Sequence, residues 1–131
     1  MLPRNRWFVA AALVYALAGG LVGLAWLAFP GALPASVLRA HAHLMLVGFV
    51  GMMIFGIGLH VLPRFTGRAL FSERLADAQF VLVNLGLISM MFGWLGGARI
   101  ATGVGGALLW TGFVLFAVNV VATVRPWMRR G

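Results

Sequence analysis

Cysteine is absent from this sequence of 131 residues. Disulfide bonds, thiolate metal sites and cysteine nucleophiles are therefore excluded. Lysine is absent as well, so all ten basic residues are arginine, and only Glu73 and Asp77 oppose them.

Charge of either sign is scarce, because charged residues make up 9% of the chain and hydrophobic residues 63%. A soluble domain carries about 25% charged residues. The composition therefore predicts a protein whose solvent is the lipid bilayer. The net charge of +8 does not indicate nucleic-acid binding, because the arginines stand between apolar runs and form no basic stripe. At this length, we expect a single domain, residues 1–131.

Four apolar runs are each long enough to cross the hydrocarbon core of a membrane, which takes about 20 helical residues. They predict an all-α, polytopic membrane four-helix bundle with spans at about residues 7–29, 37–62, 73–95 and 101–124.

Proline and serine mark the expected ends of these helices. Pro63 and Pro126 should close the second and fourth helices, because proline cannot continue the backbone ladder. Ser36 and Ser72 are expected N-caps of the second and third helices.

The distribution of arginine predicts the topology, because cytoplasmic loops of membrane proteins carry an excess of arginine and lysine. Only Arg39 and Arg99 fall on one side of the predicted bundle. The other eight fall on the opposite side, which is therefore cytoplasmic and holds both termini: Arg4, Arg6, Arg64, Arg68, Arg74, Arg125, Arg129 and Arg130.

Ionisable groups inside membrane spans are functional candidates. In this chain such groups are found only among the histidines of the second span. His41 and His43 are two residues apart and should project about 200° from each other, so one helix cannot direct both at a single metal ion. His60 lies about 28 Å further along the helix. We expect His60 to be structural, hydrogen-bonded to Asn119. For the pair, a functional site and simple hydration at the bilayer interface both stay open.

A haem site is one reading of this pair, because haem needs an axial imidazole, an apolar slot and cations for its propionates. Gly48 and Gly51 would let a porphyrin lie against the helix. Arg39 and Arg99 stand at the right depth for propionates, although snorkelling to the interface explains them equally well.

The second span and the loop after it resemble one helix of the haem–copper oxidase catalytic subunit. The similarity covers His41-Ala42-His43 and the run from His60 through Pro63 to Gly67. By this resemblance, His41 ligates a high-spin haem and His43 a low-spin haem. An alignment of residues 38–41 with an earlier helix of the family makes His41 the low-spin ligand instead. The resemblance implies one third of a twelve-helix core.

The chain also departs from that family. It lacks the further histidines of the copper centre, and Tyr15 matches no redox-active tyrosine motif. Glu73 and Asp77 do not supply an intramembrane carboxylate relay. One chain therefore cannot be an oxygen-reducing, proton-pumping oxidase, and whether it is an enzyme at all stays open. Since one chain offers a single axial ligand per site, we expect a homo-oligomer, either a trimer or a dimer.

These inferences predict a cytochrome-like protein of the bacterial inner (cytoplasmic) membrane. It would bind b-type haem through His41 and His43 between protomers, with copper or another metal as an alternative at the second histidine. Its role would be electron transfer or binding of a diatomic gas, with a respiratory-chain partner. The alternative is a non-catalytic accessory or assembly subunit of a respiratory complex.

Overall fold

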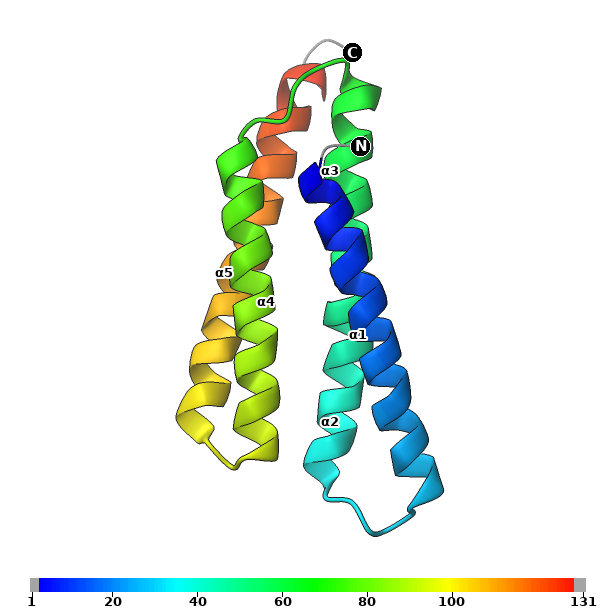
Figure 1. Ribbon diagram of the computed structural model, residues 1–131. Coiled ribbons are helices and arrows are strands. Elements are labelled where there is room, and N and C mark those ends of the chain that lie inside the picture. Colours follow the sequence, from blue (N-terminus) through cyan, green and yellow to red (C-terminus); the bar gives the residue numbers. More distant parts are fainter. Residues whose placement is uncertain (1–2, 129–131) are drawn as a thin grey trace.

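The computed structural model describes residues 3–128, which form four long helices in an up-and-down order (Figure 1). The first is α1, Pro3–Ala28. The second is one continuous helix, called helix II below, made of α2 (Ala35–His43), η1 (Leu44–Gly51) and α3 (Met52–Thr66). The third and fourth are α4 (Glu73–Leu95) and α5 (Arg99–Met128). All four are long and apolar enough to cross a membrane, so the predicted all-α membrane fold is confirmed.

Both prolines expected to close helices lie inside them, so these two predictions were wrong. α3 continues past Pro63 to Thr66, because an internal proline removes only one backbone hydrogen bond. The helix ends instead at Gly67, whose φ of 63° is left-handed and natural only for glycine. α5 likewise continues through Pro126.

The two predicted N-caps had different outcomes. Ser72 caps α4 as predicted, because its Oγ accepts a hydrogen bond of 3.2 Å from the backbone N–H of Leu75. Ser36 does not cap helix II, since α2 already begins at Ala35 after Pro34.

Helix II contains a π-helical segment, Leu44–Gly51, immediately after the histidine pair. A π-helix places more residues in each turn than an α-helix and is found most often near functional sites. The segment reads Leu-Met-Leu-Val-Gly-Phe-Val-Gly, an apolar run that does not differ from an α-helical one. Its geometry therefore could not be predicted from the sequence.

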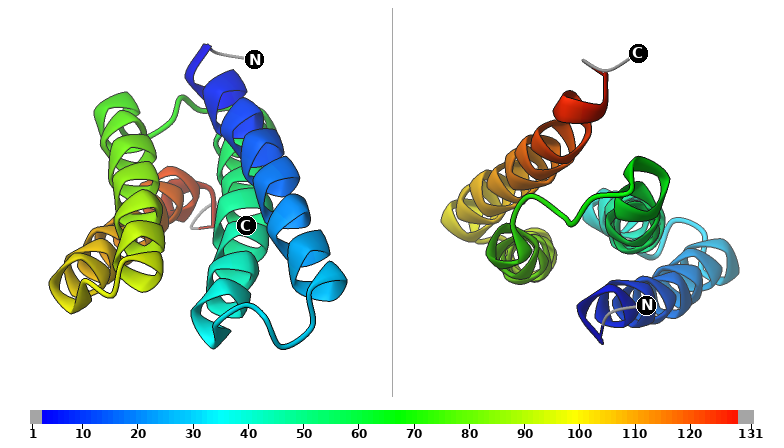
Figure 2. Two further views of the ribbon diagram at one scale, coloured as in Figure 1. Left: turned by 60° about the horizontal axis from the view of Figure 1, so that its bottom comes forward. Right: turned by 90° about the horizontal axis from the view of Figure 1, so that it is seen from above.

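The four helices pair into two hairpins, α1 with helix II and α4 with α5 (Figures 1 and 2). Within the second hairpin the backbones meet at glycines, which bring Gly86 of α4 against Gly105 of α5. Such close approach is the usual role of small residues between membrane helices.

Side chains of α1 connect the two hairpins at three levels. The ring of Phe8 lies edge-on to those of Phe55 in α3 and Phe80 in α4, with centroids 6.2 and 5.0 Å away. The Tyr15 hydroxyl donates a hydrogen bond of 2.7 Å to Oδ1 of Asn84 in α4.

The third level lies near the start of α1, where the Arg4 guanidinium pairs with both Glu73 and Asp77 of α4. Both carboxylates lie in the first two turns of α4. Their partner was not predicted, because it is 69 and 73 residues away along the chain.

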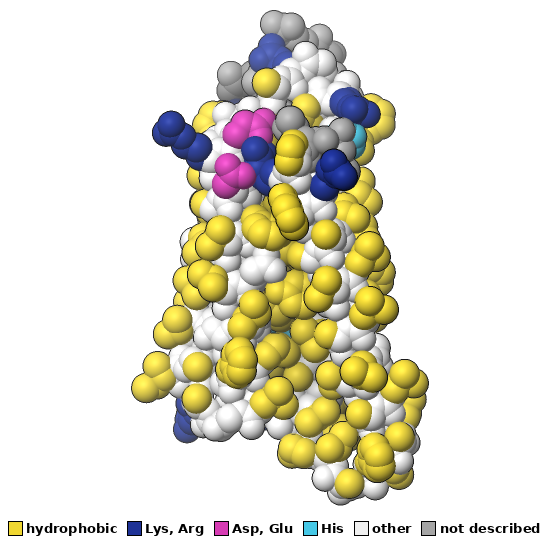
Figure 3. Space-filling model, in the orientation of Figure 1, with side chains coloured by type: hydrophobic (Ala, Val, Ile, Leu, Met, Phe, Trp, Pro, Cys, Tyr) yellow, Lys and Arg dark blue, Asp and Glu magenta, His cyan; other side chains and the backbone are white. Residues whose placement is uncertain are grey.

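The start of α1 and the end of α5 lie at the same end of the bundle (Figure 1). Charged side chains gather mainly around this end, and hydrophobic ones are spread over the rest of the visible face, apart from basic side-chain atoms near the opposite end (Figure 3). An apolar band with a charged end is what a membrane-spanning protein requires. Arg129 and Arg130, which contributed to the predicted topology, lie outside the described residues. That the charged end faces the cytoplasm stays a prediction.

Candidate functional site

The two histidines of the pair stand at the end of α2, just before the π-helical segment, and point to different neighbours. His41 reaches α1, where it contacts Gly19 and Gly23. His43 reaches α4, where it contacts Trp94. The predicted projection to opposite sides of the helix is confirmed by these contacts. Each imidazole therefore belongs to its own site.

His41 is held by a hydrogen bond of 2.8 Å between its Nδ1 and the carbonyl oxygen of Gly19. A carbonyl can only accept, so Nδ1 carries the proton and Nε2 keeps its lone pair. Metal-binding histidines are commonly oriented in this way, by donation of the other ring N–H to a backbone carbonyl. The half-buried imidazole is thus positioned as a ligand.

The ring of His41 packs closely against α1 because Gly23 has no side chain. A β-carbon on Gly23 would lie 2.7 Å from Cε1 and 2.9 Å from Nδ1 of His41. The two glycines therefore have separate roles, since Gly19 supplies the carbonyl acceptor and Gly23 supplies the space.

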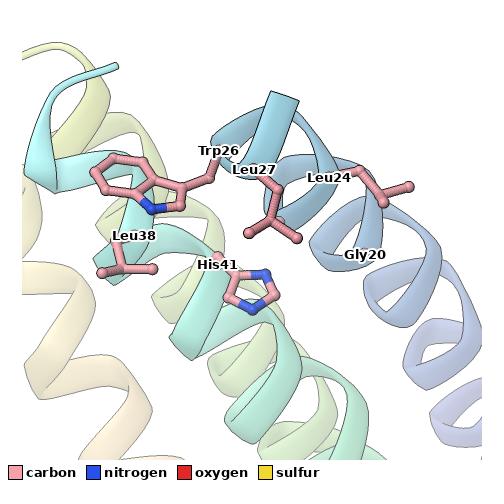
Figure 4. Close-up of a pocket in the computed structure, with 7 residues that line it drawn as sticks. Gly20, Leu24, Trp26, Leu27, Leu38 and His41 are labelled. Carbon is pink, nitrogen blue, oxygen red and sulfur yellow. The ribbon is translucent and has the colours of Figure 1, made fainter. Parts of the chain in front are cut away.

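An open pocket of about 470 Å³ lies between α1 and α2, and His41 forms part of its wall (Figure 4). The other lining residues are apolar or glycine: Gly20, Gly23, Leu24, Trp26, Leu27 and Leu38. We call this the His41 pocket. An apolar wall with one imidazole suits a hydrophobic cofactor with a metal at its centre.

His43 belongs to a second cluster on the other side of helix II. Its Nδ1 donates a hydrogen bond of 3.1 Å to the carbonyl of Arg39, one turn earlier, so its Nε2 also keeps a lone pair. The ring stands edge-on to Trp94 at 4.6 Å between centroids. The Arg39 guanidinium lies 6.0 Å from the centre of the same indole, a cation–π distance.

The two candidate propionate partners stand apart from the His41 pocket. Arg39 is engaged with Trp94 on the α4 side, and the exposed Arg99 begins α5. Neither lines the His41 pocket. Within this chain, Arg39 therefore belongs to the His43 side.

Gly48 and Gly51 are both buried within helix II. A β-carbon on Gly48 would lie 2.7 Å from Cβ of Tyr15 and 3.0 Å from Cδ2 of Leu87. The sequence predicted a porphyrin beside Gly48, but these side chains occupy that space. The glycines that open onto the His41 pocket are instead Gly20 and Gly23 of α1.

His60 lies in α3, towards the charged end, and lines a different pocket. The predicted hydrogen bond between His60 and Asn119 was wrong. The Asn119 carboxamide instead bonds the backbone N–H and C=O of Ser72, at 3.0 and 2.8 Å, and so holds the start of α4 against α5. Across residues 3–128, no three side chains of the metal-binding types gather at one point.

Substituting Gly23 with alanine is expected to displace the imidazole of His41 and weaken cofactor binding without unfolding the bundle. The added methyl would overlap the ring, whose hydrogen bond to Gly19 would then be lost. Loss of an orienting contact of this kind typically costs about 10–100-fold in metal affinity. Haem titration of the purified protein measures the change. Gly103→Ala is the matched control, because nothing lies within 4 Å of the added carbon; equal affinity in both variants would contradict the expected role of Gly23.

Comparison with known proteins identifies a family. Residues 5–103 match the family model described as Cytochrome C and Quinol oxidase polypeptide I. The matched part includes α1, helix II and α4, and therefore both histidines of the pair. The curated proteins and the solved structures yield no significant match.

Proposed function

Because the chain belongs to the cytochrome c and quinol oxidase polypeptide I family, we propose that it is a cytochrome-like membrane protein that binds b-type haem through His41. The full-length members of this family carry haem and copper. The proposal rests on the geometry of His41. Its Nδ1–H donates a hydrogen bond to the carbonyl of Gly19, which leaves Nε2 available to a ligand in an apolar pocket.

The residues of the His41 pocket fit one face of a haem. His41 would supply an axial nitrogen, and Trp26, Leu24, Leu27 and Leu38 would pack against the macrocycle and keep water from it. When bound, the haem iron supplies one-electron redox chemistry or a position for a diatomic gas. A copper centre built from three histidines does not fit, because His41 and His43 face different helices and His60 lines a separate pocket.

A second axial ligand has to come from another copy of the chain. No other imidazole lines the His41 pocket, and this pocket is open to its surroundings. A second chain placed against this opening would close the pocket and supply the missing ligand. We therefore propose a homo-oligomer with haem between protomers, either a two-fold dimer or a trimer that reproduces a twelve-helix core.

His43 provides a second, independent site in the same proposal. Its free Nε2 lies beside Trp94, with Arg39 and Arg99 at the same end of the bundle to pair with propionates. Neutral imidazole also suits copper or another transition metal. Electrons passed between the two sites, or to a respiratory-chain partner, would make the protein an electron carrier of the bacterial inner membrane, with both termini cytoplasmic.

Absorption spectra of the detergent-purified protein test the proposal directly. We expect a Soret band, with sharp α and β bands after reduction with dithionite if the iron has two axial imidazoles. A protein that stays colourless after haem supplementation would contradict haem binding. The second candidate function, an accessory or assembly subunit of a respiratory complex, would then take its place.

A further inference from the structure

The opening of the His41 pocket is bordered by exposed apolar side chains. Leu24 and Leu27 of α1 and Leu38 of α2 line the pocket, with exposed fractions of 64%, 75% and 47%. Among the described residues, no charged side chain lines it. A charged surface placed over this opening would therefore lose its water without gaining a counter-charge. An apolar surface would lose nothing of this kind.

Under the proposed function, an iron bound at His41 needs a second axial nitrogen from outside the chain. Nε2 of His41 is the only free imidazole nitrogen in the pocket. A partner's copy of His60 cannot be the source, because His60 lines the pocket at the charged end and a partner inserted in the same orientation keeps it there. The second ligand therefore comes from His41 or His43 of another chain.

His43 of another chain is a poor source, because a charged group accompanies it. Its Nδ1 donates to the carbonyl of Arg39, whose guanidinium lies 6.0 Å from the centre of the Trp94 indole. The same indole contacts the ring of His43. Docking this side of helix II onto a partner's His41 pocket would press the guanidinium against an apolar wall, at the cost of its hydration. A head-to-tail pairing of His41 with His43 is therefore disfavoured.

His41 of another chain avoids this cost. Two chains that share one orientation in the membrane, and are related by a two-fold axis along the membrane normal, place identical residues at identical depth. Pocket against pocket, they cover apolar lining residues with apolar lining residues. Each chain brings one imidazole whose Nδ1–H is already engaged by the carbonyl of Gly19.

We propose that the protein is a two-fold dimer in which His41 of each chain binds the same haem, so that two chains share one haem at this site. The proposal rests on the haem function proposed above. Because both axial positions are taken by imidazole, no coordination position is left for a diatomic gas, and the site is one of electron transfer. His43 takes no part in it.

Chemical crosslinking tests the dimer without reference to haem, because the chain has no cysteine of its own. A residue near a two-fold axis lies beside its own copy. Leu27→Cys, at the opening of the pocket, should therefore be joined to its own copy by a short bis-maleimide in membranes. Val104→Cys is the matched control, because Val104 is also exposed but lies near the start of α5. Equal crosslinking of both variants, or none at Leu27→Cys, would overturn the dimer.

The His43→Ala variant isolates the shared site from the second proposed site. It should contain one haem for two chains and give a low-spin spectrum that carbon monoxide leaves unchanged, since both axial positions are filled. A mixed dimer, in which one of the two chains also carries His41→Ala, should become high-spin and bind carbon monoxide. Different tags on the two chains allow the mixed dimer to be purified.

The results separate this proposal from the haem function on which it rests. One haem for each chain of the His43→Ala variant, or carbon monoxide binding by that variant, would overturn the shared ligand and leave haem binding intact. A dimer that is crosslinked through Leu27→Cys but stays colourless after haem supplementation would overturn the haem function, and the shared ligand with it.

Discussion

Replacing His41 with alanine is expected to remove the Soret band of its pocket from the purified protein. The reason is that Nε2 of His41 is the only nitrogen ligand that lines this pocket, and the surrounding residues offer apolar contact alone. Without an axial ligand, haem would be retained only by hydrophobic packing and would be lost during purification. The measurement is the haem-to-protein ratio, from the absorption spectrum and the pyridine haemochromogen.

Two further variants make this result specific. Leu46→Ala truncates an exposed side chain of the same helix, away from the pocket, and should retain the full haem content. His43→Ala reports on the second cluster, because His43 contacts α4 and not α1. If each imidazole holds its own group, the His41 and His43 variants lose different spectral components. An unchanged Soret band in the His41 variant would contradict the proposed ligand.

Replacing Gly105 with alanine is expected to destabilise the bundle by about 1–3 kcal/mol, the usual cost of forcing extra volume into a packed interface. The added carbon would lie 2.6 Å from the carbonyl oxygen of Gly86 and 2.8 Å from the backbone nitrogen of Met90. Both contacts are with the backbone of α4, so no side-chain rotation relieves them and the two helices must separate.

The neighbouring Gly106 is the matched control, because nothing lies within 4 Å of a carbon added there. Gly106→Ala should be neutral or stabilising by up to about 1 kcal/mol, since alanine favours a helix over glycine. Unfolding in mixed detergent micelles, followed by circular dichroism, gives both values. Equal stability of the two variants would show that α4 and α5 do not meet at Gly105.

The helices could be predicted because hydrophobic length alone decides which segments cross a membrane. Their ends were harder, because a proline such as Pro63 reads as a stop although a helix tolerates it at the cost of one hydrogen bond. The capping residue Ser72 was read correctly, since its hydrogen bond to Leu75 is local in sequence. The pairing of Arg4 with α4 was missed because it depends on how the hairpins meet.

The candidate site, too, could be predicted only in part. Helical periodicity was enough to predict that His41 and His43 face opposite sides, because they belong to one regular stretch of helix. The acceptor of the His41 proton, the space supplied by Gly23 and the indole beside His43 all come from other helices. A single sequence carries no direct record of such contacts, so Trp94 and Gly19 were not singled out as partners of the imidazoles.

The π-helical segment divides helix II into two parts with separate tasks. The part before it, α2, presents the imidazoles, and the part after it, α3, fills the core beside Phe8. One residue corresponds to about 100° of rotation in an α-helix. Loss of a single residue between Leu44 and Gly51 would therefore turn α2 relative to α3 by about that angle. Evolution can thus redirect the face that carries His41 and His43 by a one-residue deletion or insertion while the remainder of the bundle keeps its packing.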